Sequence, residues 1–430
     1  MKATMDTNGE TTRAGVVGLG YVGLPLALAM ADAGYDVVGI DIDTERVATL
    51  ELGESYVSDI ADSTVQEHLG ERFRATSDYS ALSNVDGISV CVPTPLRKSG
   101  QPDISYIIDA TEELASVISP ESTVVLESTV YPGATSDILA PTLAENGHEV
   151  GEDVFVAFSP ERIDPGNEEY GTTDIPKVLG GVTPACGDRA EALYAPVFDE
   201  VVRVDTSTEA ELVKLLENTF RSVNIALINE MATVAHDLDI NIWNVIDAAD
   251  TKPFGFMTFY PGPGLGGHCI PIDPLYLSWK ADQKGISTQF IDLADSVNRQ
   301  MPQHVADRVI SLLNQDGTAA PESEVLLLGV AYKPGVTDTR ESPGLDIISL
   351  LEESGVTVRY HDPHVPAVEI GDDRYESSEL SPELLAKSDC SIVVTDHDDI
   401  DFDRVVEHAP LVFDTRNATG GVEADHVHRL

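Results

Sequence analysis

Basic residues are scarce in this chain of 430 residues. Lys and Arg together number 26 against 74 Asp and Glu, for a formal net charge of −48 at pH 7. A protein that binds nucleic acid needs a basic surface for the phosphates, so the composition argues against a nucleic-acid partner. Excess carboxylates keep a protein hydrated in concentrated salt, which predicts a halophilic protein. In so acidic a chain, a Lys or Arg inside a motif is expected to have a specific anionic partner.

Cysteine is also scarce, with Cys91, Cys186, Cys269 and Cys390 far apart in the sequence. No C-x-x-C pair occurs, so neither a zinc site nor a disulfide framework is indicated, and a reducing cytoplasm is expected. Cys91 and Cys390 stand in apolar, strand-like runs typical of the core. Cys186 stands in a loop-like "TPACGD" segment, and we assign it no role.

Long apolar runs are rare, and the one from Ala14 to Ala31 is uncharged throughout. Its length would suit a membrane span, but its glycines and Pro25 suit a strand, a turn and a helix instead. The preceding "MKATMDTNGETTR" has no apolar signal core. We therefore expect a cytoplasmic protein with no membrane partner.

Apolar runs alternate with helical patterns at both ends of the chain, as in parallel βαβ units. Expected strands lie in "AGVVGLG", "DVVGID", "GISVCVP", "TVVLEST" and "VFVAFSP", and later in "EVLLLGVAYKPG", "GVTVRYHDP", "DCSIVVTDHD" and "APLVFDTRN". The predicted fold is α/β, with two Rossmann-like doubly wound parallel-sheet domains joined by a long helix and a central helical region. The predicted boundaries are 1–203, 204–300 and 301–430.

A long helix is predicted after Thr206, which forms a capping-box pattern with Glu209. Positions 212, 215, 216, 219, 220, 223 and 227 make one largely apolar stripe at helical spacing. Lys214 and Asn218 lie four residues apart on the opposite face. That face is either a solvated exterior or the wall of a cleft, where Lys214 and Asn218 would stabilise a developing oxyanion.

A dinucleotide-binding pattern, G-x-G-x-x-G, occurs at Gly18, Gly20 and Gly23. The glycines allow a tight turn and close approach of the backbone to a pyrophosphate at a helix N-terminus, and Gly34 suits the end of that helix. Asp41 follows the next strand about 20 residues on, as the fingerprint requires. Its carboxylate would bond the adenosine ribose and repel a 2'-phosphate, which predicts NAD rather than NADP.

Cys269 stands in "PGPGLGGHCIPIDP", with His268 beside it and Asp273 four residues on. A loop so rich in Gly and Pro can place backbone N–H groups and a thiolate against a ligand. Beside a nicotinamide site, a nucleophilic cysteine suggests oxidation of an aldehyde held as a thiohemiacetal. A simple buried cysteine is the alternative.

These motifs resemble the UDP-glucose/UDP-mannose dehydrogenase family, the NAD-dependent oxidases of a nucleotide sugar's C6 hydroxyl. The resemblance covers nearly the whole chain through "GLGYVGLP", "VPTP", "ESTVYPG", "FSPER", "AELVKLLENTFRSVNIALINE", "GGHCIPID", "YKPGVTDTRESP" and "FDTRN". It implies an NAD domain, a helical dimerisation core carrying the cysteine loop, and a UDP-sugar-binding domain, in a homodimer or higher homo-oligomer. The expected process is nucleotide sugar metabolism for polysaccharide biosynthesis.

The resemblance also assigns residue roles. Cys269 matches the nucleophile, Asp273 an activator of water, and Lys214 and Asn218 the stabilisers of the oxyanion. Thr129 and Glu161 match the residues that bind catalytic water and the reacting oxygen. The implied cofactor-binding residues are Gly18, Gly20, Tyr21, Val22, Gly23, Asp41, Arg46, Thr94 and Thr129. The implied substrate-binding residues are Glu161, Arg162, Lys214, Asn218, Tyr260, Gly266, Lys333, Arg340 and Arg416, and no metal is implied.

The sugar is less well determined than the family. "SPERIDPGN" and "KPFGFMTFYPGPGLGGHCIPIDP" look most like the UDP-N-acetylglucosamine 6-dehydrogenase branch, with UDP-N-acetylmannosamine and UDP-glucose as alternatives. Some members have an Arg from the neighbouring subunit where this chain has Lys252. Two other hypotheses are a one-step hydroxyacid dehydrogenase, which would not need Cys269, and a non-catalytic NAD-binding sensor.

Overall fold

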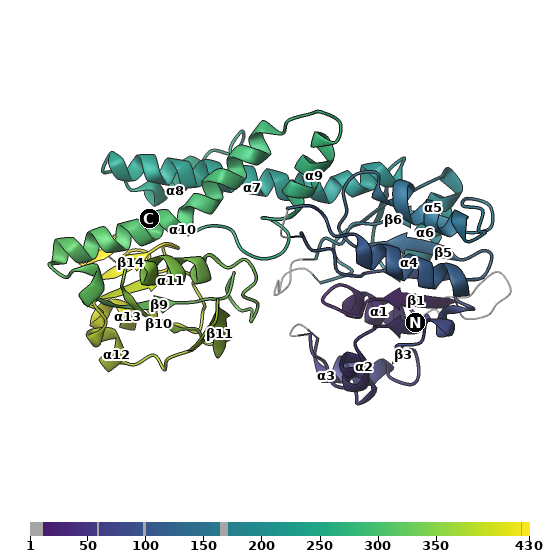
Figure 1. The fold of residues 1–430 in the computed structure, drawn as a ribbon, viewed down its shortest axis with the longest axis horizontal. Helices are drawn as coiled ribbons and strands as arrows, with labels where there is room; N and C mark the ends of the chain where they lie inside the picture. Colours follow the sequence, from purple (N-terminus) through teal and green to yellow (C-terminus); the bar gives the residue numbers. More distant parts are fainter. Residues whose placement is uncertain (1–11, 58–59, 98–99, 164–170, 423) are drawn as a thin grey trace. The chain divides into compact units, whose positions relative to one another are not determined.

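The computed structural model describes residues 12–57, 60–97, 100–163, 171–422 and 424–430 (Figure 1). The chain divides into unit 1, Met1–Glu217 with Asp282–Lys284, and unit 2, Asn218–Ala281 with Gly285–Leu430. Most of "MKATMDTNGETTR" and the "DPGN" of "SPERIDPGN" lie outside the described residues. Within the described ranges, no helix has the length and apolar character needed to cross a membrane.

Unit 1 contains an eight-stranded sheet in the order β3-β2-β1-β4-β5-β6-β7-β8. Its strands are β1 (Arg13–Val17), β2 (Asp36–Ile40), β3 (Phe73–Thr76), β4 (Gly87–Val90), β5 (Thr123–Leu126), β6 (Phe155–Phe158), β7 (Lys177–Gly181) and β8 (Val201–Arg203). All five strands expected in this half are present, whereas β3, β7 and β8 were not foreseen. Neighbouring strands are parallel except β6 and β7, which pair antiparallel. The first residue of β7 therefore lies at the edge where β6 ends.

The helices of unit 1 connect these strands. They are α1 (Gly23–Asp32), α2 (Thr44–Glu51), α3 (Asp62–His68), α4 (Ser105–Val117), α5 (Ala140–Glu145) and α6 (Pro184–Tyr194), with a 3-10 turn η1 (Tyr79–Leu82) and a π-helical turn η2 (Thr135–Leu139). Cys186 lies in α6, not in a loop as its sequence context suggested. Thr183 caps this helix by accepting a bond from the Cys186 N–H, and Pro184 is tolerated in the first turn, where no N–H partner is needed.

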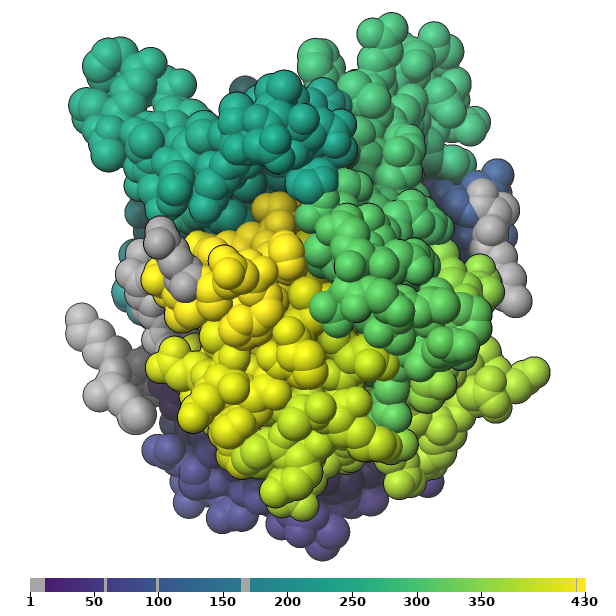
Figure 2. All heavy atoms as spheres, turned by 90° about the vertical axis from the view of Figure 1, so that its left-hand side faces the viewer, coloured from purple at the N-terminus to yellow at the C-terminus, as the bar shows by residue number. Residues whose placement is uncertain are grey.

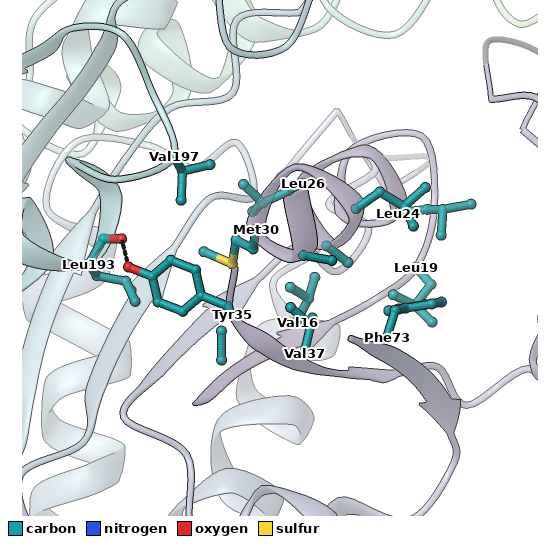
Figure 3. Packing of buried hydrophobic residues seen from close by; sticks show 14 of the residues in the cluster. Val16, Leu19, Leu24, Leu26, Met30, Tyr35, Val37, Phe73, Leu193 and Val197 are labelled. Carbon is teal, nitrogen blue, oxygen red and sulfur yellow. Dashed lines mark hydrogen bonds between the residues drawn. The ribbon is translucent and has the colours of Figure 1, made fainter. Parts of the chain in front are cut away.

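Helix α1 packs its apolar face on the sheet next to the glycine turn (Figure 3). Leu26 and Met30 of α1 and Val16 of β1 are fully buried together. Tyr35, which follows α1, donates from its hydroxyl to the Leu193 carbonyl at 2.7 Å. Burying a side chain such as Leu or Met contributes about 1.5–3 kcal/mol. This packing fixes α1, and hence the turn at its N-terminus, against the sheet.

Helix α7 (Ser207–Asp237) begins with the predicted capping box. The Thr206 hydroxyl accepts from the Glu209 N–H at 3.2 Å, and the Glu209 carboxylate accepts from the Thr206 N–H at 3.1 Å. The predicted apolar stripe includes exposed members, with Leu216 62% and Leu227 54% accessible. On the opposite face, Asn218 is buried, Lys214 and Ile225 are half-buried, and Arg221 is exposed. That face is therefore solvated only in part, and its role as the wall of a cleft stays a prediction.

Unit 2 continues with α8 (Ile242–Asp250), α9 (Asp273–Asp282) and the long α10 (Gln289–Asp316). Its second sheet has the order β10-β9-β13-β14-β15, with every pair of neighbours parallel. The remaining elements are η3 (Ala320–Glu322), β9 (Glu324–Leu328), α11 (Pro343–Glu353), β10 (Thr357–His361), β11 (Ala367–Ile370), β12 (Asp373–Glu376), α12 (Pro382–Lys387), β13 (Cys390–Val393), α13 (Phe402–His408), β14 (Val412–Asp414) and β15 (Val427–Arg429).

The second sheet is covered on one face by α10 and α11, whose apolar residues share one core with β9, β10 and β13. Figure 2 shows green atoms, the colour of α10, against yellow atoms of the C-terminal residues. The four strands expected here are present, whereas the β11-β12 hairpin and β15 were not foreseen. The two large, mainly parallel sheets and the long helix confirm the predicted α/β Rossmann-like fold class. The three-part division at 203 and 300 stays a prediction.

Candidate active site

The glycine pattern forms a tight turn between β1 and α1. Gly18 has φ +89, and a Cβ on Gly23 would lie 1.8 Å from the Gly18 carbonyl oxygen, so both positions require glycine. Gly20 has nothing within 4 Å of its Cβ direction. Val22 directly precedes α1 and makes no side-chain capping bond, and the Tyr21 side chain is 38% exposed. Open space in front of a backbone turn at a helix N-terminus fits a dinucleotide pyrophosphate.

Asp41 directly follows β2 and is buried at this turn. Its carboxylate accepts from the Leu19 N–H and the Asp43 N–H, both at 2.9 Å. Arg46 lies 3.7 Å from the same carboxylate and 5.4 Å from the centre of the Tyr56 ring. Tyr56, which the sequence analysis missed, donates to the Leu19 carbonyl at 2.6 Å. The structure thus brings Asp41 and Arg46 together beside the glycine turn.

Further predicted residues follow β4 and β5, which are adjacent parallel strands. Ser128 donates to the Val92 carbonyl at 2.7 Å and so joins the loops after the two strands. Thr94, in the first of these loops, is half-buried. Thr129, in the second, accepts from Lys214 Nζ at 2.7 Å. Two predicted residues 85 positions apart, Thr129 and Lys214, are therefore in direct contact.

Glu161 belongs to a buried cluster that the sequence analysis did not anticipate. Lys177 Nζ lies 2.6 Å from Glu127 and 3.1 Å from Glu161. Burial by itself raises the pKa of both carboxyls. At Glu161 the Lys177 charge and two backbone N–H bonds outweigh it and lower the pKa, whereas at Glu127 burial prevails and the pKa is raised. The scarcity of lysine could have pointed to Lys177, because a lysine in so acidic a chain is expected to have an anionic partner.

Arg162 holds the loop after β6 to helix α7. Its guanidinium makes two bonds to Glu217, at 2.8 and 3.2 Å, and a third to the Pro176 carbonyl at 2.9 Å. Nearby on α7, buried Glu211 accepts from the backbone N–H groups of Gly133 and Thr135. The first turns of α7 are thus fastened to the loops that carry Thr129 and Glu161. Contact between Arg162 and substrate stays a prediction.

In unit 2, Asn218 and the cysteine loop form a second cluster. Asn218 donates to Asp273 at 2.6 Å, and both side chains are buried. Asp273 is the first residue of α9, and its N–H donates to the Cys269 carbonyl at 2.8 Å. Cys269 itself is half-buried. The helix start therefore holds Cys269, Asp273 and Asn218 together.

The glycines of the cysteine loop allow close packing on the loop after β9. A Cβ on Gly266 would lie 2.7 Å from that of Tyr332. Gly267 has φ +81, and its N–H donates to the Arg340 carbonyl at 2.9 Å. His268 lies 3.8 Å from Asp338, which also pairs with the Arg340 guanidinium at 2.6 Å. The cysteine loop is therefore joined to the segment that contains Lys333 and Arg340.

Arg416 approaches the same loop from the end of β14. Its Nε donates to the Val394 carbonyl at 2.9 Å, and a Cβ on Gly262 would lie 2.8 Å from its guanidinium. Lys333 Nζ lies 6.0 Å from the centre of the Tyr332 ring. Tyr260 is half-exposed and stacks on Trp243 at 5.8 Å. Lys333 and Arg416 thus lie in loops at the carboxyl edge of the second sheet. Tyr260 lies two residues before Gly262, which Arg416 approaches.

A cavity of about 170 Å³ lies in unit 2 beside the cysteine loop. Its lining combines cysteine-loop residues with residues of α7, α10, α11 and the loop before α11, and comprises Ser222, Leu265, Pro271, Asp295, Asn298, Arg299, Pro302, Glu341 and Asp346. Asn298 is buried and bonds Asn229 at 3.0 Å, which in turn accepts from the Gly262 N–H at 2.9 Å. Sequence reasoning missed this amide pair, whose residues are separated by 69 positions.

Models of one family match three successive segments of the chain. They are described as the UDP-glucose/GDP-mannose dehydrogenase family's NAD binding domain (residues 12–198), central domain (208–300) and UDP binding domain (326–421).

Relatives of known name match at similar identity. A UDP-N-acetyl-D-mannosamine dehydrogenase of Methanococcus maripaludis is 35% identical over 94% of this chain and 92% of its own length. A UDP-N-acetyl-D-glucosamine 6-dehydrogenase of Pseudomonas aeruginosa is 36% identical over 82% of this chain and 83% of its own length. The solved structure of the Pyrococcus horikoshii UDP-D-ManNAc dehydrogenase superposes with a TM-score of 0.89 at 31% identity, over 97% of this chain and 99% of that one.

Proposed function

This chain belongs to the UDP-glucose/GDP-mannose dehydrogenase family and is an NAD-dependent UDP-sugar dehydrogenase, and we propose that it oxidises the C6 hydroxyl of a UDP-N-acetylhexosamine to the uronate. The observation that carries the proposal is the cluster in which Asn218 bonds Asp273 at 2.6 Å and Asp273 N–H bonds the Cys269 carbonyl at 2.8 Å. It fixes a half-buried thiol beside a carboxylate and an amide donor.

The glycine turn and Asp41 would hold NAD, and the open space at Gly20 fits it. When bound, NAD accepts a hydride from C6 in each of the two oxidations that separate an alcohol from a carboxylic acid. Thr94 and Thr129, on the loops after β4 and β5, complete the predicted cofactor-binding set.

Cys269 is the proposed nucleophile. Its thiolate would add to the C6 aldehyde, so that the aldehyde is held as a thiohemiacetal and does not escape between the two oxidations. Lys214 and Asn218, one helical turn apart on α7, would donate to the oxyanion of this adduct. After the second oxidation, the adduct is a thioester of Cys269.

Hydrolysis of the thioester requires a positioned water. Asp273, Thr129 and Glu161 are the proposed residues that bind and activate it, since each presents an oxygen that can accept a hydrogen bond. Lys333, Arg340 and Arg416 are proposed to meet the UDP phosphates, where cationic donors are needed. Arg162, Tyr260 and Gly266 complete the proposed substrate contacts.

Two epimers are the candidate substrates. The cysteine-loop sequence favours UDP-N-acetylglucosamine, whereas the TM-score of 0.89 with a UDP-D-ManNAc dehydrogenase favours UDP-N-acetylmannosamine. UDP-glucose is the third sugar to test. The polysaccharide pathway that would use the uronate is also part of the proposal.

The test counts NADH formed per sugar consumed, with each of the three UDP-sugars and excess NAD in high salt. Two NADH per sugar are expected, and the sugar with the highest kcat/KM identifies the substrate. Cys269→Ser is expected to release no uronate, with Cys186→Ser, in α6, as the matched control that keeps activity. One NADH per sugar, or full uronate production by Cys269→Ala, would contradict the covalent route.

We also propose a cytoplasmic, salt-adapted homodimer. The exposed apolar residues Leu212, Leu216, Phe220 and Leu227 of α7 support association through this helix, because a contiguous apolar face is unfavourable in water. Sedimentation in high salt tests the dimer, and Leu216→Glu with Leu227→Glu is expected to give monomers. Lys252, exposed and 5.1 Å from the Phe254 ring centre, stays a candidate for a contact across subunits.

A further inference from the structure

One lysine and two glutamates are enclosed together at an edge of the first sheet. The exposed fraction is 4% for Lys177, 1% for Glu127 and 7% for Glu161. The Tyr194 hydroxyl donates to Glu127 and lies 2.9 Å from Ser89 Oγ. Buried charges are retained only where they are paired and hydrogen-bonded, so such a cluster calls for a reason beyond stability.

The topology of the sheet creates the cluster. Glu127 follows β5 directly, and Glu161 comes shortly after β6, so both lie at the carboxyl edge of these parallel strands. Lys177 is the first residue of β7, which runs antiparallel to β6 and therefore starts at that same edge. This edge is where open α/β sheets bind their ligands.

The bonds to Glu161 leave its carboxylate little freedom. One oxygen accepts from the N–H groups of Arg162 and Ile163, at 2.6 and 2.7 Å, and the other accepts from Lys177 at 3.1 Å. An ionised carboxylate has about four acceptor positions, so the bonds from the described residues leave one position for a water or a substrate hydroxyl. Glu127 takes the shorter bond from Lys177, at 2.6 Å, and so anchors the ammonium from its other side.

We propose that Lys177 is a positioning residue for the reaction, and that its ammonium, anchored by Glu127, holds the Glu161 carboxylate ionised and in one orientation. The inference rests on the proposed role of Glu161 in thioester hydrolysis. Lys177 is not placed against the substrate, and it acts through Glu161.

The charged and titratable surroundings support this assignment. Lys177 lies 5.1 Å from the Phe198 ring centre and 5.6 Å from that of Tyr194, which shield it from solvent. Burial raises the pKa of the Cys91 thiol and of the Tyr194 hydroxyl, with Glu127 adding to both shifts, so both groups are neutral at pH 7. Arg162 is neutralised by Glu217. Among the described residues, Lys177 is therefore the cation that contacts Glu161, and together with the N–H groups of Arg162 and Ile163 it favours the ionised carboxylate.

The test compares kcat and its pH profile in the wild type, Lys177→Met, Lys177→Arg and the double variant Lys177→Met with Glu127→Gln. The double variant removes a cation and an anion together, which avoids leaving Glu127 buried without its partner. Without Lys177, burial favours protonation of Glu161, so the acid limb of the profile is expected to move to higher pH. The misdirected carboxylate is expected to lower kcat about a hundredfold.

Further readouts separate positioning from stability. KM for NAD and the melting temperature of the double variant in high salt are expected to stay near the wild-type values, and Lys177→Arg is expected to restore the acid limb. Lys387→Met, at an exposed lysine of α12, is the matched control. A double variant with wild-type kcat and an unmoved acid limb would overturn the inference.

An infrared measurement on the intact wild type tests the inference without the lysine variants. The carboxylate band lost in Glu161→Gln should persist below pH 5, and its disappearance near neutral pH would overturn the inference. Wild-type kcat in Glu161→Gln would instead refute the role proposed for Glu161. If the wild type forms two NADH per sugar and the double variant behaves like the wild type, the proposed function is supported and only the role proposed for Lys177 is refuted.

Discussion

The amide of Asn218 donates to the buried carboxylate of Asp273 at 2.6 Å, which joins the middle of α7 to the first residue of α9. Because the Asp273 N–H also bonds the Cys269 carbonyl, this contact fixes the cysteine loop as well. One hydrogen bond therefore links the long helix with two proposed catalytic residues.

Asn218→Ala is expected to reduce both stability and activity. The buried Asp273 carboxylate loses a donor, which costs about 1–3 kcal/mol of unfolding free energy. The loss of one oxyanion donor is expected to lower kcat by about 10²–10³. Urea unfolding and steady-state kinetics in high salt measure the two effects. Asn224→Ala on the same helix, where the side chain donates to the Phe220 carbonyl, is the control.

Asp41 is expected to determine the choice between NAD and NADP. Its carboxylate would bond the ribose hydroxyls of NAD and repel a 2'-phosphate. Asp41→Asn is expected to raise KM for NAD about tenfold. It is also expected to lower the ratio of kcat/KM with NAD to kcat/KM with NADP. Asp109→Asn, at an exposed position of α4, should change neither. An unchanged ratio in Asp41→Asn would show that another residue excludes NADP.

The capping box at the start of α7 gives a stability prediction. Thr206→Ala removes the 3.2 Å bond to the Glu209 N–H, and such a loss costs about 1 kcal/mol. Thermal unfolding in high salt measures it, with Thr208→Ala, inside the first turn, as the comparison. If the two variants were equally stable, the cap would contribute little to the fold.

Asp362, beside the second sheet, provides a prediction of how stability depends on pH. It is buried after β10, accepts from Val330 N–H at 2.7 Å, and bonds His397 at 3.1 Å. Burial alone would raise its pKa, but His397 and the backbone N–H groups outweigh it and hold the pKa well below the usual value.

The folded-state pKa of Asp362 thus lies below the unfolded value of about 3.9, so its stabilisation is complete above that pH and is lost as the pH falls through the folded pKa. Asp362→Asn is expected to be less stable than the wild type by about 2–3 kcal/mol at pH 7. Below about pH 4, its unfolding free energy is expected to fall less steeply with pH than that of the wild type. Urea titrations at several pH values between 7 and 3 measure both. An identical acid slope in the variant would refute the assignment.

Salt is expected to be required for the folded state. At a net charge of −48, the carboxylates repel one another. Salt screens this repulsion, because the Debye length shortens from about 10 Å at 0.1 M salt to about 3 Å at 1 M. Near-ultraviolet circular dichroism and activity should therefore fall on dilution of KCl and return when KCl is restored. An uncharged osmolyte at equal osmolarity is the control, and full stability in dilute buffer would contradict the prediction.

The sequence by itself determined features that depend on neighbouring residues. The turn requires glycine at Gly18 and Gly23 because a Cβ there would strike the backbone, and the capping box at Thr206 and Glu209 closes within one helical turn. Strands such as β1 and β5 are continuous apolar runs because they are buried on both faces.

Only the tertiary structure decided which distant side chains meet. Lys177 reaches Glu127 and Glu161 because β7 is antiparallel to β6, and nothing in the local sequence specifies that direction. The burial of Asn218 and the exposure of Leu216 depend on what packs against α7, whereas helical periodicity gives only their relative angle. Neighbouring residues determine where helices, strands and turns form. Long-range packing determines which distant side chains come into contact in the proposed site.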